Sequence, residues 1–152
     1  MKGMTRNLAT LALVAACAAC DGAPTASSAL AAPADGPALA QSPGVLTFSS
    51  TQSYTDQSPQ TATGALARID FTGSLTTGQP CYVVTGSHTA RNGTVTLTVT
   101  ATRTGDVCAQ VVTHNNYQGS VAGLTPGTYT FTVIHSVNNT RTTAFTGTVV
   151  VQ

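Results

Sequence analysis

The clearest structural signal in the chain is Thr94-Val95-Thr96-Leu97-Thr98-Val99-Thr100-Ala101-Thr102, in which polar and apolar residues alternate. Successive side chains of a β-strand point to opposite faces, so this period of two predicts a strand with one buried and one solvated face. β-branched threonine suits the pleated backbone, and its hydroxyl can face water. The stretch therefore predicts a half-buried strand of an antiparallel sheet.

The same alternation recurs through most of the C-terminal half. Tyr129, Phe131 and Val133 alternate with threonines, and a similar pattern runs from Phe145 to Val151. Further strands are expected over residues 65–75, 82–90, 107–114 and 120–122. Turns between strands are predicted at Arg91-Asn92-Gly93-Thr94, Thr104-Gly105-Asp106 and Asn138-Asn139-Thr140. Six or seven short strands without helical periodicity predict an all-β, antiparallel, Ig-like sandwich.

Composition narrows the class of protein. The chain has 152 residues, of which 41% are hydrophobic and only 7% charged, with a formal net charge of +1. This length suits one domain plus a tail. The low charge argues against nucleic acid as a partner, and the many threonines argue against a helical bundle.

The N-terminus has the pattern of an export signal. Lys2 and Arg6 precede a short apolar run over residues 8–16, which is too short to span a bilayer. The run ends in Val14-Ala15-Ala16-Cys17, which resembles the lipobox of bacterial lipoproteins. The resemblance implies a signal peptide over residues 1–16 and a lipid bilayer as the partner of an acylated Cys17. Cys20, after Ala18-Ala19, is the alternative, and an ordinary secretory signal is a third interpretation.

The choice of cysteine bears on localisation in the cell envelope. In the enterobacterial lipoprotein pattern, Asp after the lipidated cysteine retains the protein in the inner membrane. Asp21 follows Cys20, whereas Ala18 follows Cys17. Lipidation at Cys17 therefore implies the outer membrane, and lipidation at Cys20 the inner membrane.

A spacer is expected between this anchor and the domain. Residues 17–44 are rich in Ala, Pro, Ser and Gly and show no periodic apolar face, so we expect a disordered tether. Residues 45–62 fit either a strand or a linker, because Val45-Leu46-Thr47-Phe48 is a short apolar start to a polar segment. The sandwich is expected over residues 63–152.

One turn resembles a feature of known sandwich families. Gly123-Leu124-Thr125-Pro126-Gly127-Thr128-Tyr129 is similar to a turn in fibronectin-type-III, immunoglobulin-like and prealbumin-like domains. The resemblance implies that Leu124 closes the end of the core and that the Tyr129 hydroxyl bonds back to the turn. The longer stretch from Cys81 to His135 is similar to uncharacterised domains of bacterial lipoproteins, which implies no specific activity.

Cys81 and Cys108 are expected to form a structural disulfide, because an exported protein meets an oxidising compartment. In a flat three-stranded meander these cysteines would lie two strand spacings apart, about 9.5 Å, which is too far for a disulfide. Either one outer segment leaves that sheet, or one cysteine sits in a loop that crosses its end.

The residues do not predict catalysis or a cofactor. Ser87 and His88 are neighbours in a predicted strand and so point to opposite faces, and the chain contains no Glu. His88, His114 and His135 are candidate copper or zinc ligands by residue type, but no two have short ligand spacing. We therefore expect neither an enzyme nor a bound metal.

The most polar segment is expected to be a recognition loop. His114, Asn115, Asn116 and Tyr117, followed by Gln118, are predicted to form a loop at the end of the sandwich, where such domains often bind partners. The function expected is a non-catalytic structural or interaction module of the cell envelope, with a protein or glycan partner. The alternative is a module that binds a glycan, copper or zinc through residues 114–118 or through the histidines.

Overall fold

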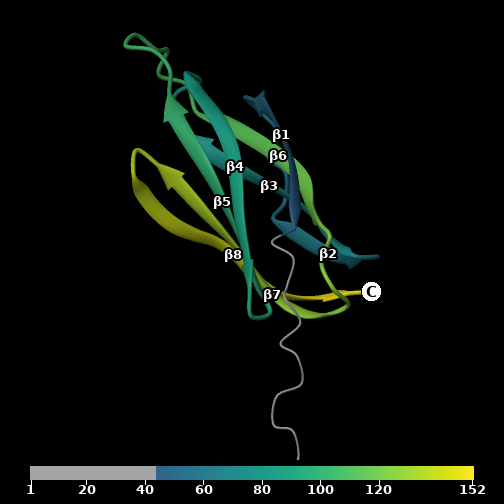
Figure 1. The fold of residues 1–152 in the computed structure, drawn as a ribbon. Helices are drawn as coiled ribbons and strands as arrows, with labels where there is room; N and C mark the ends of the chain where they lie inside the picture. The colour runs from purple at the N-terminus through teal and green to yellow at the C-terminus, as the bar shows by residue number, and fades with distance from the viewer. Residues whose placement is uncertain (1–43) are drawn as a thin grey trace, which may run out of the picture. The chain divides into compact units, whose positions relative to one another are not determined.

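The computed structural model describes residues 44–152, which form two four-stranded β-sheets and, over this range, no helix (Figure 1). The strands are β1 (Val45–Ser53), β2 (Thr61–Ala65), β3 (Arg68–Thr77), β4 (Tyr82–Arg91), β5 (Thr94–Arg103), β6 (Thr113–Ala122), β7 (Gly127–Val137) and β8 (Thr140–Val151). One sheet has the order β1-β6-β3-β2 and the other β4-β5-β7-β8. The predicted all-β sandwich is confirmed.

The predicted signal peptide, Cys17, Cys20 and the tether up to residue 43 lie outside the described residues. Within residues 44–152, no helix is long and apolar enough to cross a membrane.

The segment that fitted either a strand or a linker contains β1 and the start of β2, so the sandwich has eight strands rather than six or seven. Leu46 and Phe48 of β1 pack against the core, while the rest of the strand is mostly Ser and Thr. Two inward apolar residues are too few to distinguish a strand from a linker by periodicity alone.

Strand β5 follows its sequence pattern closely. Val95, Leu97 and Val99 are completely buried, and the alternating threonines occupy the outer face. Phe131 of β7 is also completely buried and stacks on Phe71 of β3, with ring centroids 5.9 Å apart. Because β3 and β7 belong to different sheets, this aromatic pair joins the two layers across the core.

One pair of strands departs from the antiparallel prediction. After β5 the chain crosses to the other sheet, forms β6, and returns as β7, which lies parallel to β5. The turn at Asn92-Gly93 is a tight hairpin with positive φ at both residues, 49° and 73°, as the sequence predicted. Thr104-Gly105-Asp106, by contrast, begins the loop that crosses between the sheets.

One predicted strand is wrong at its start. Residues 107–112 were expected to begin a strand that continued to His114, but they belong to the crossing loop, and β6 begins only at Thr113. The valines of this segment mimic the composition of a strand, yet Val107 is 93% exposed and Val111 and Val112 are also exposed. These side chains are exposed and not part of the core, so their β-propensity does not determine the local structure.

The turn before β7 matches the expected sandwich feature. Leu124 is buried in the core, and the Tyr129 hydroxyl donates to the carbonyl of Thr125 at 2.9 Å. The same hydroxyl lies 3.0 Å from Thr125 Oγ1. Tyr129 therefore fixes the chain that leads into β7, as the resemblance to the sandwich families implied.

The lateral edges of the two sheets lie close to each other. Gly86 of β4 faces the ring of Phe48 in β1, and a Cβ there would overlap that ring. On the other side, a Cβ at Gly64 of β2 would overlap the Val150 carbonyl of β8. Two glycines thus permit close approach between neighbouring edge strands, which leaves the outer faces of the sheets as the broad accessible surfaces.

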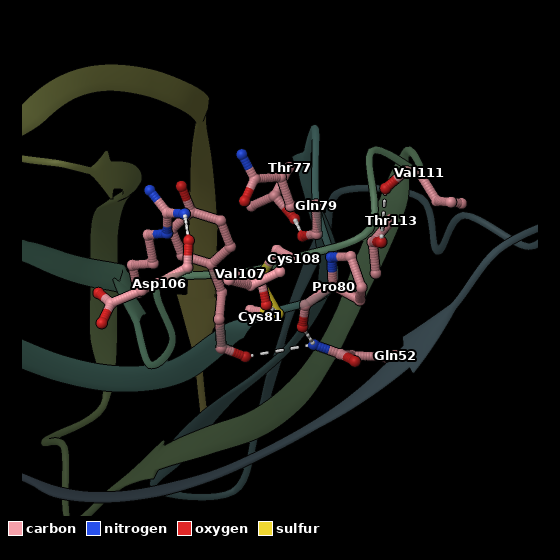
Figure 2. The surroundings of a disulfide bond; sticks show 12 residues. Gln52, Thr77, Gln79, Pro80, Cys81, Asp106, Val107, Cys108, Val111 and Thr113 are labelled. Atoms are coloured by element: carbon pink, nitrogen blue, oxygen red, sulfur yellow. Dashed lines mark hydrogen bonds between the residues drawn. A yellow bond between two sulfur atoms is a disulfide. The ribbon is translucent and has the colours of Figure 1, made fainter.

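The disulfide between Cys81 and Cys108 is present, with Cα atoms 6.0 Å apart (Figure 2). Cys81 directly precedes β4, and Cys108 lies in the crossing loop, so both conditions considered from the sequence are met: the chain leaves the sheet and a cysteine lies in a loop. The Thr104 amide also donates to the Cys81 carbonyl at 3.1 Å. Close by, the Gln52 amide donates to the Pro80 carbonyl at 2.7 Å and so ties β1 to this end of the sandwich (Figure 2).

Candidate functional site

Residues 114–118 do not form the predicted loop, because they lie within a strand. They belong to β6, which pairs with β1 on one side and β3 on the other. Asn115 and Tyr117 point into the sandwich and are 1% and 2% exposed. His114 and Asn116 lie on the outer face.

Asn115 explains why this strand looks like a loop in sequence. Its side-chain amide donates to the Leu75 carbonyl at 3.1 Å and to Thr77 Oγ1 at 3.2 Å, and its oxygen accepts from Gln52 at 3.2 Å. A buried polar side chain is tolerated when its hydrogen bonds are satisfied. Sequence patterning treats such a residue as solvent-facing and therefore misses the strand.

The three histidines lie in separate environments. His88 is on β4, whereas Nδ1 of His114 lies 3.0 Å from Thr76 Oγ1 on the outer face of the other sheet. His135 is near the end of β7 and meets Tyr117 inside the sandwich. Among residues 44–152, no three His, Cys, Asp or Glu side chains form a group that could hold a metal ion.

His135 belongs to a small polar cluster between the sheets. The Tyr117 hydroxyl donates to Gln60 Oε1 at 2.8 Å and lies 2.9 Å from Nε2 of His135. Gly73 makes room for the cluster, since a Cβ there would overlap both Gln60 and Tyr117. Gln60 sits just before β2, and no feature of the sequence pointed to its role.

Burial changes the acid–base properties of this cluster. Desolvation raises the pKa of Tyr117 to about 12, although the hydrogen bond with Gln60 opposes the change. Desolvation also lowers the pKa of His135 below its ordinary value of 6.5. Both groups are therefore neutral at neutral pH, and the cluster is suited to holding the sheets together rather than to transferring protons.

The lowered pKa of His135 makes stability depend on pH. In the unfolded chain the imidazole takes up a proton near pH 6.5, whereas in the folded protein it does so only at lower pH. The unfolded state therefore binds more protons in this window, and stability should fall as pH falls below about 6.5. Urea denaturation at a series of pH values between about 7.5 and 5 measures the effect.

His135→Gln is the control for this pH dependence. The variant keeps a polar side chain near Tyr117 but does not titrate, so its stability should change less over the same pH range. An equal slope in the two proteins would show that His135 is not the responsible group.

A polar groove lies on the outer face of the β1-β6-β3-β2 sheet. Its main hollow has a volume of about 560 Å³, and a second hollow of about 200 Å³ shares Ser49, Thr72 and Gln118 with it. The outward side chains that line the main hollow are all polar: Thr47, Ser49, Thr61, Thr63, Arg68, Asp70, Thr72, Gln118 and Ser120. The volume falls in the range of small-ligand sites, but the lining is much more polar than is usual for them.

Strand register places these side chains in two adjacent rows. One row crosses the sheet as Thr47, Ser120, Asp70 and Thr63, and the next as Ser49, Gln118, Thr72 and Thr61. Neighbouring strands are about 4.8 Å apart, so each row presents polar groups at a regular spacing.

The segment between β1 and β2 borders the groove. It crosses the outer face of the sheet, where Asn116 donates to the Asp56 carbonyl at 2.9 Å and accepts from the Ser58 amide at 2.8 Å. Further along, Thr72 Oγ1 donates to the Pro59 carbonyl at 3.0 Å. Asn116, a predicted binding residue, therefore holds one border of the groove in place.

Comparison with known proteins supports the fold. Residues 72–147, half of the chain, match the family model of the ORF11 beta-sandwich domain. The chain therefore belongs to the ORF11 beta-sandwich domain family. The match begins within β3 and ends within β8, so it includes strands of both sheets but not β1 or β2. No curated protein and no solved structure matches the chain.

Proposed function

We propose that this protein is a lipid-anchored, non-catalytic binding module of the bacterial cell envelope, and that the groove on the β1-β6-β3-β2 sheet is its binding surface. The observation that carries the binding role is the hollow of about 560 Å³ lined entirely by polar outward side chains.

The anchor part of the proposal is supported by the N-terminal sequence. Val14-Ala15-Ala16-Cys17 resembles a lipobox, and the following Ala- and Pro-rich residues suit a spacer between a membrane and a domain. A bilayer is then the first partner of the chain, through acylated Cys17, and the outer membrane is the expected location. Cys20 remains the alternative site, with the inner membrane as its location.

The non-catalytic part is supported by the placement of the reactive residues. Ser87 is exposed and His88 half-buried on opposite faces of β4, which is unsuitable for proton transfer between them. The carboxylate of the groove, Asp70, forms an ion pair with Arg68 at 3.0 Å. A paired surface carboxylate is better suited to binding than to general acid–base catalysis.

Cys17→Ser tests the anchor. The variant should lose acylation, because serine has no thiol to form the thioether, and it should be nearly absent as mature protein from the membrane fraction. The measurement is cell fractionation together with the intact mass of the membrane-extracted protein. Cys20→Ser is the matched control and should retain both the acyl mass and the membrane location.

Each other outcome has a definite meaning. Loss of acylation only in Cys20→Ser would move the anchor to Cys20 and favour the inner membrane. Acyl groups on neither cysteine of the wild-type protein would overturn the lipoprotein proposal and leave a secreted domain.

A further inference from the structure

We infer that the groove binds a neutral glycan, with Asp70, Thr72 and Gln118 as the main contact residues. This inference rests on the proposed binding role of the groove and specifies the chemical class of its ligand. The argument uses the charge of the groove, its hydrogen-bonding groups and the strands that form its floor.

The groove has no net charge to offer a charged ligand. Its two ionised side chains, Arg68 and Asp70, pair with each other, with Arg68 Nε 3.0 Å from Asp70 Oδ1 and 3.1 Å from Oδ2. A phosphate or a polyanionic chain would be repelled by Asp70 as it approached Arg68, and a cationic ligand would be repelled by Arg68 as it approached Asp70. The lining therefore favours an uncharged partner.

Hydrogen-bonding capacity is the main property of the surface. Thr47 and Ser120 hydroxyls lie 3.0 Å apart, and those of Thr61 and Thr72 lie 2.7 Å apart. A hydroxyl has one donor and two acceptor sites, so both pairs keep free acceptor sites for a ligand, although the Thr72 hydrogen is already donated to the Pro59 carbonyl. Gln118, exposed on central strand β6, adds an amide donor and acceptor. Dense, mixed donors and acceptors complement the hydroxyl groups of a sugar.

Asp70 is well placed for adjacent sugar hydroxyls. Its side chain is 41% exposed despite the contact with Arg68, and it stands in a row between Ser120 and Thr63. An ionised carboxylate accepts several hydrogen bonds, and hydrogen bonds to a charged acceptor are stronger than neutral ones. Hydroxyls on neighbouring ring carbons could donate to its two oxygens together.

The floor of the groove disfavours an extended peptide. Peptides commonly bind sheets by adding a strand to an open edge, where backbone groups are unpaired. The centre of the groove lies over β6 and β3, which are the two internal strands of this sheet and have neighbours on both sides. The outward side chains also include no aromatic or large aliphatic group to form a pocket for a peptide side chain. A peptide would therefore find neither backbone partners nor apolar anchors.

The test is an amide-resolved NMR titration of the full-length protein in detergent micelles. The probes are a neutral N-acetylglucosamine tetramer, a neutral mannose tetramer, an anionic galacturonate tetramer and a neutral Ser/Thr-rich peptide. We expect at least one neutral sugar to shift the amide signals of Asp70, Thr72 and Gln118 in a saturable way. Asp70→Asn and Gln118→Ala should each weaken this binding by about tenfold or more.

Thr72→Ala and Thr132→Ala form a matched pair of variants. Thr72 lies in the groove on internal strand β3, and Thr132 lies on the outer face of internal strand β7 in the other sheet. Each hydroxyl has a threonine partner on the next strand, Thr61 for Thr72 and Thr146 for Thr132, and Thr72 Oγ1 also donates to the Pro59 carbonyl at the border of the groove. Only Thr72→Ala should weaken sugar binding, whereas equal weakening by both would overturn the assignment of the groove.

A cross-linking arm separates this inference from the proposed function. A photo-reactive residue is placed at position 118, or at position 132 as a control, and illuminated in intact cells. Adducts at position 118 alone, together with no response to either sugar, overturn the glycan assignment and leave the binding module standing. A peptide or galacturonate response in place of a sugar response has the same meaning. If no sugar gives a response and position 118 forms no adduct, both the glycan assignment and the binding role of the groove are overturned.

Discussion

Phe131→Ala is expected to lower the free energy of unfolding by about 3–5 kcal/mol, the usual cost of truncating a buried aromatic side chain to alanine. Phe131 is completely buried, stacks on Phe71 at 5.9 Å and contacts the ring of Phe145 at 6.5 Å. Its loss would leave a cavity between the two sheets, where neighbouring strands cannot easily close in. Urea denaturation of the full-length protein measures the change.

Thr132→Ala is the control on the neighbouring residue of the same strand. Thr132 points to the outer face, and its hydroxyl lies 3.5 Å from that of Thr146, at the limit of a hydrogen bond. Its replacement should change stability by no more than about 0.5 kcal/mol. A comparable loss in both variants would mean that β7 is sensitive to backbone propensity rather than to packing between the sheets.

The parts of the fold that were predictable share one property: their inward residues are apolar and their turns have distinctive residues. Strand β5 is predictable because Val95, Leu97 and Val99 alternate with threonines. Asn92-Gly93 is predictable as a hairpin because both residues accept positive φ. Tyr129 is predictable from its resemblance to a known sandwich turn. In each case local sequence and tertiary environment favour the same structure.

The ends of β6 were predicted as parts of the strands at 107–114 and 120–122, but its centre was not, because the central inward residues are polar or glycine. Asn115 is satisfied by Leu75, Thr77 and Gln52, all distant in sequence, and Tyr117 by Gln60 and His135. These hydrogen bonds replace the apolar contacts that periodicity detects. The same residues therefore looked like an exposed recognition loop, although two of the four predicted binding residues are buried.

The groove could not be located from sequence because it depends on the register between distant strands. Thr47 meets Ser120 across the β1–β6 pair, and Ser120 meets Asp70 across β6–β3. Each of these residues is an ordinary polar side chain in its own strand. Their common surface follows from the crossover that places β6 between β1 and β3, and no local pattern reports such a crossover.

Replacing both Cys81 and Cys108 with serine is expected to lower the free energy of unfolding by about 3–4 kcal/mol. The bond joins residues 27 positions apart, so its removal frees a loop of that length in the unfolded chain. In the folded protein, the crossing loop would keep the hydrogen bond from the Thr104 amide to the Cys81 carbonyl, but Val107, Val111 and Val112 add little packing because they are exposed. Urea denaturation of the oxidised protein and the double variant gives the difference, and the variant should also show a larger m-value because its unfolded state is less compact.

Cys20→Ser is the control, because residue 20 precedes the first described strand in sequence, and its replacement should leave the denaturation midpoint unchanged. A difference of less than about 1 kcal/mol in the double variant would contradict the chain-entropy account and imply that other contacts already restrain the unfolded chain. The expected loss is large, since domains of this size are typically stable by only about 5–15 kcal/mol. The disulfide therefore substitutes for packing where the chain crosses between sheets, and a reducing environment should destabilise the sandwich to the same extent as the double substitution.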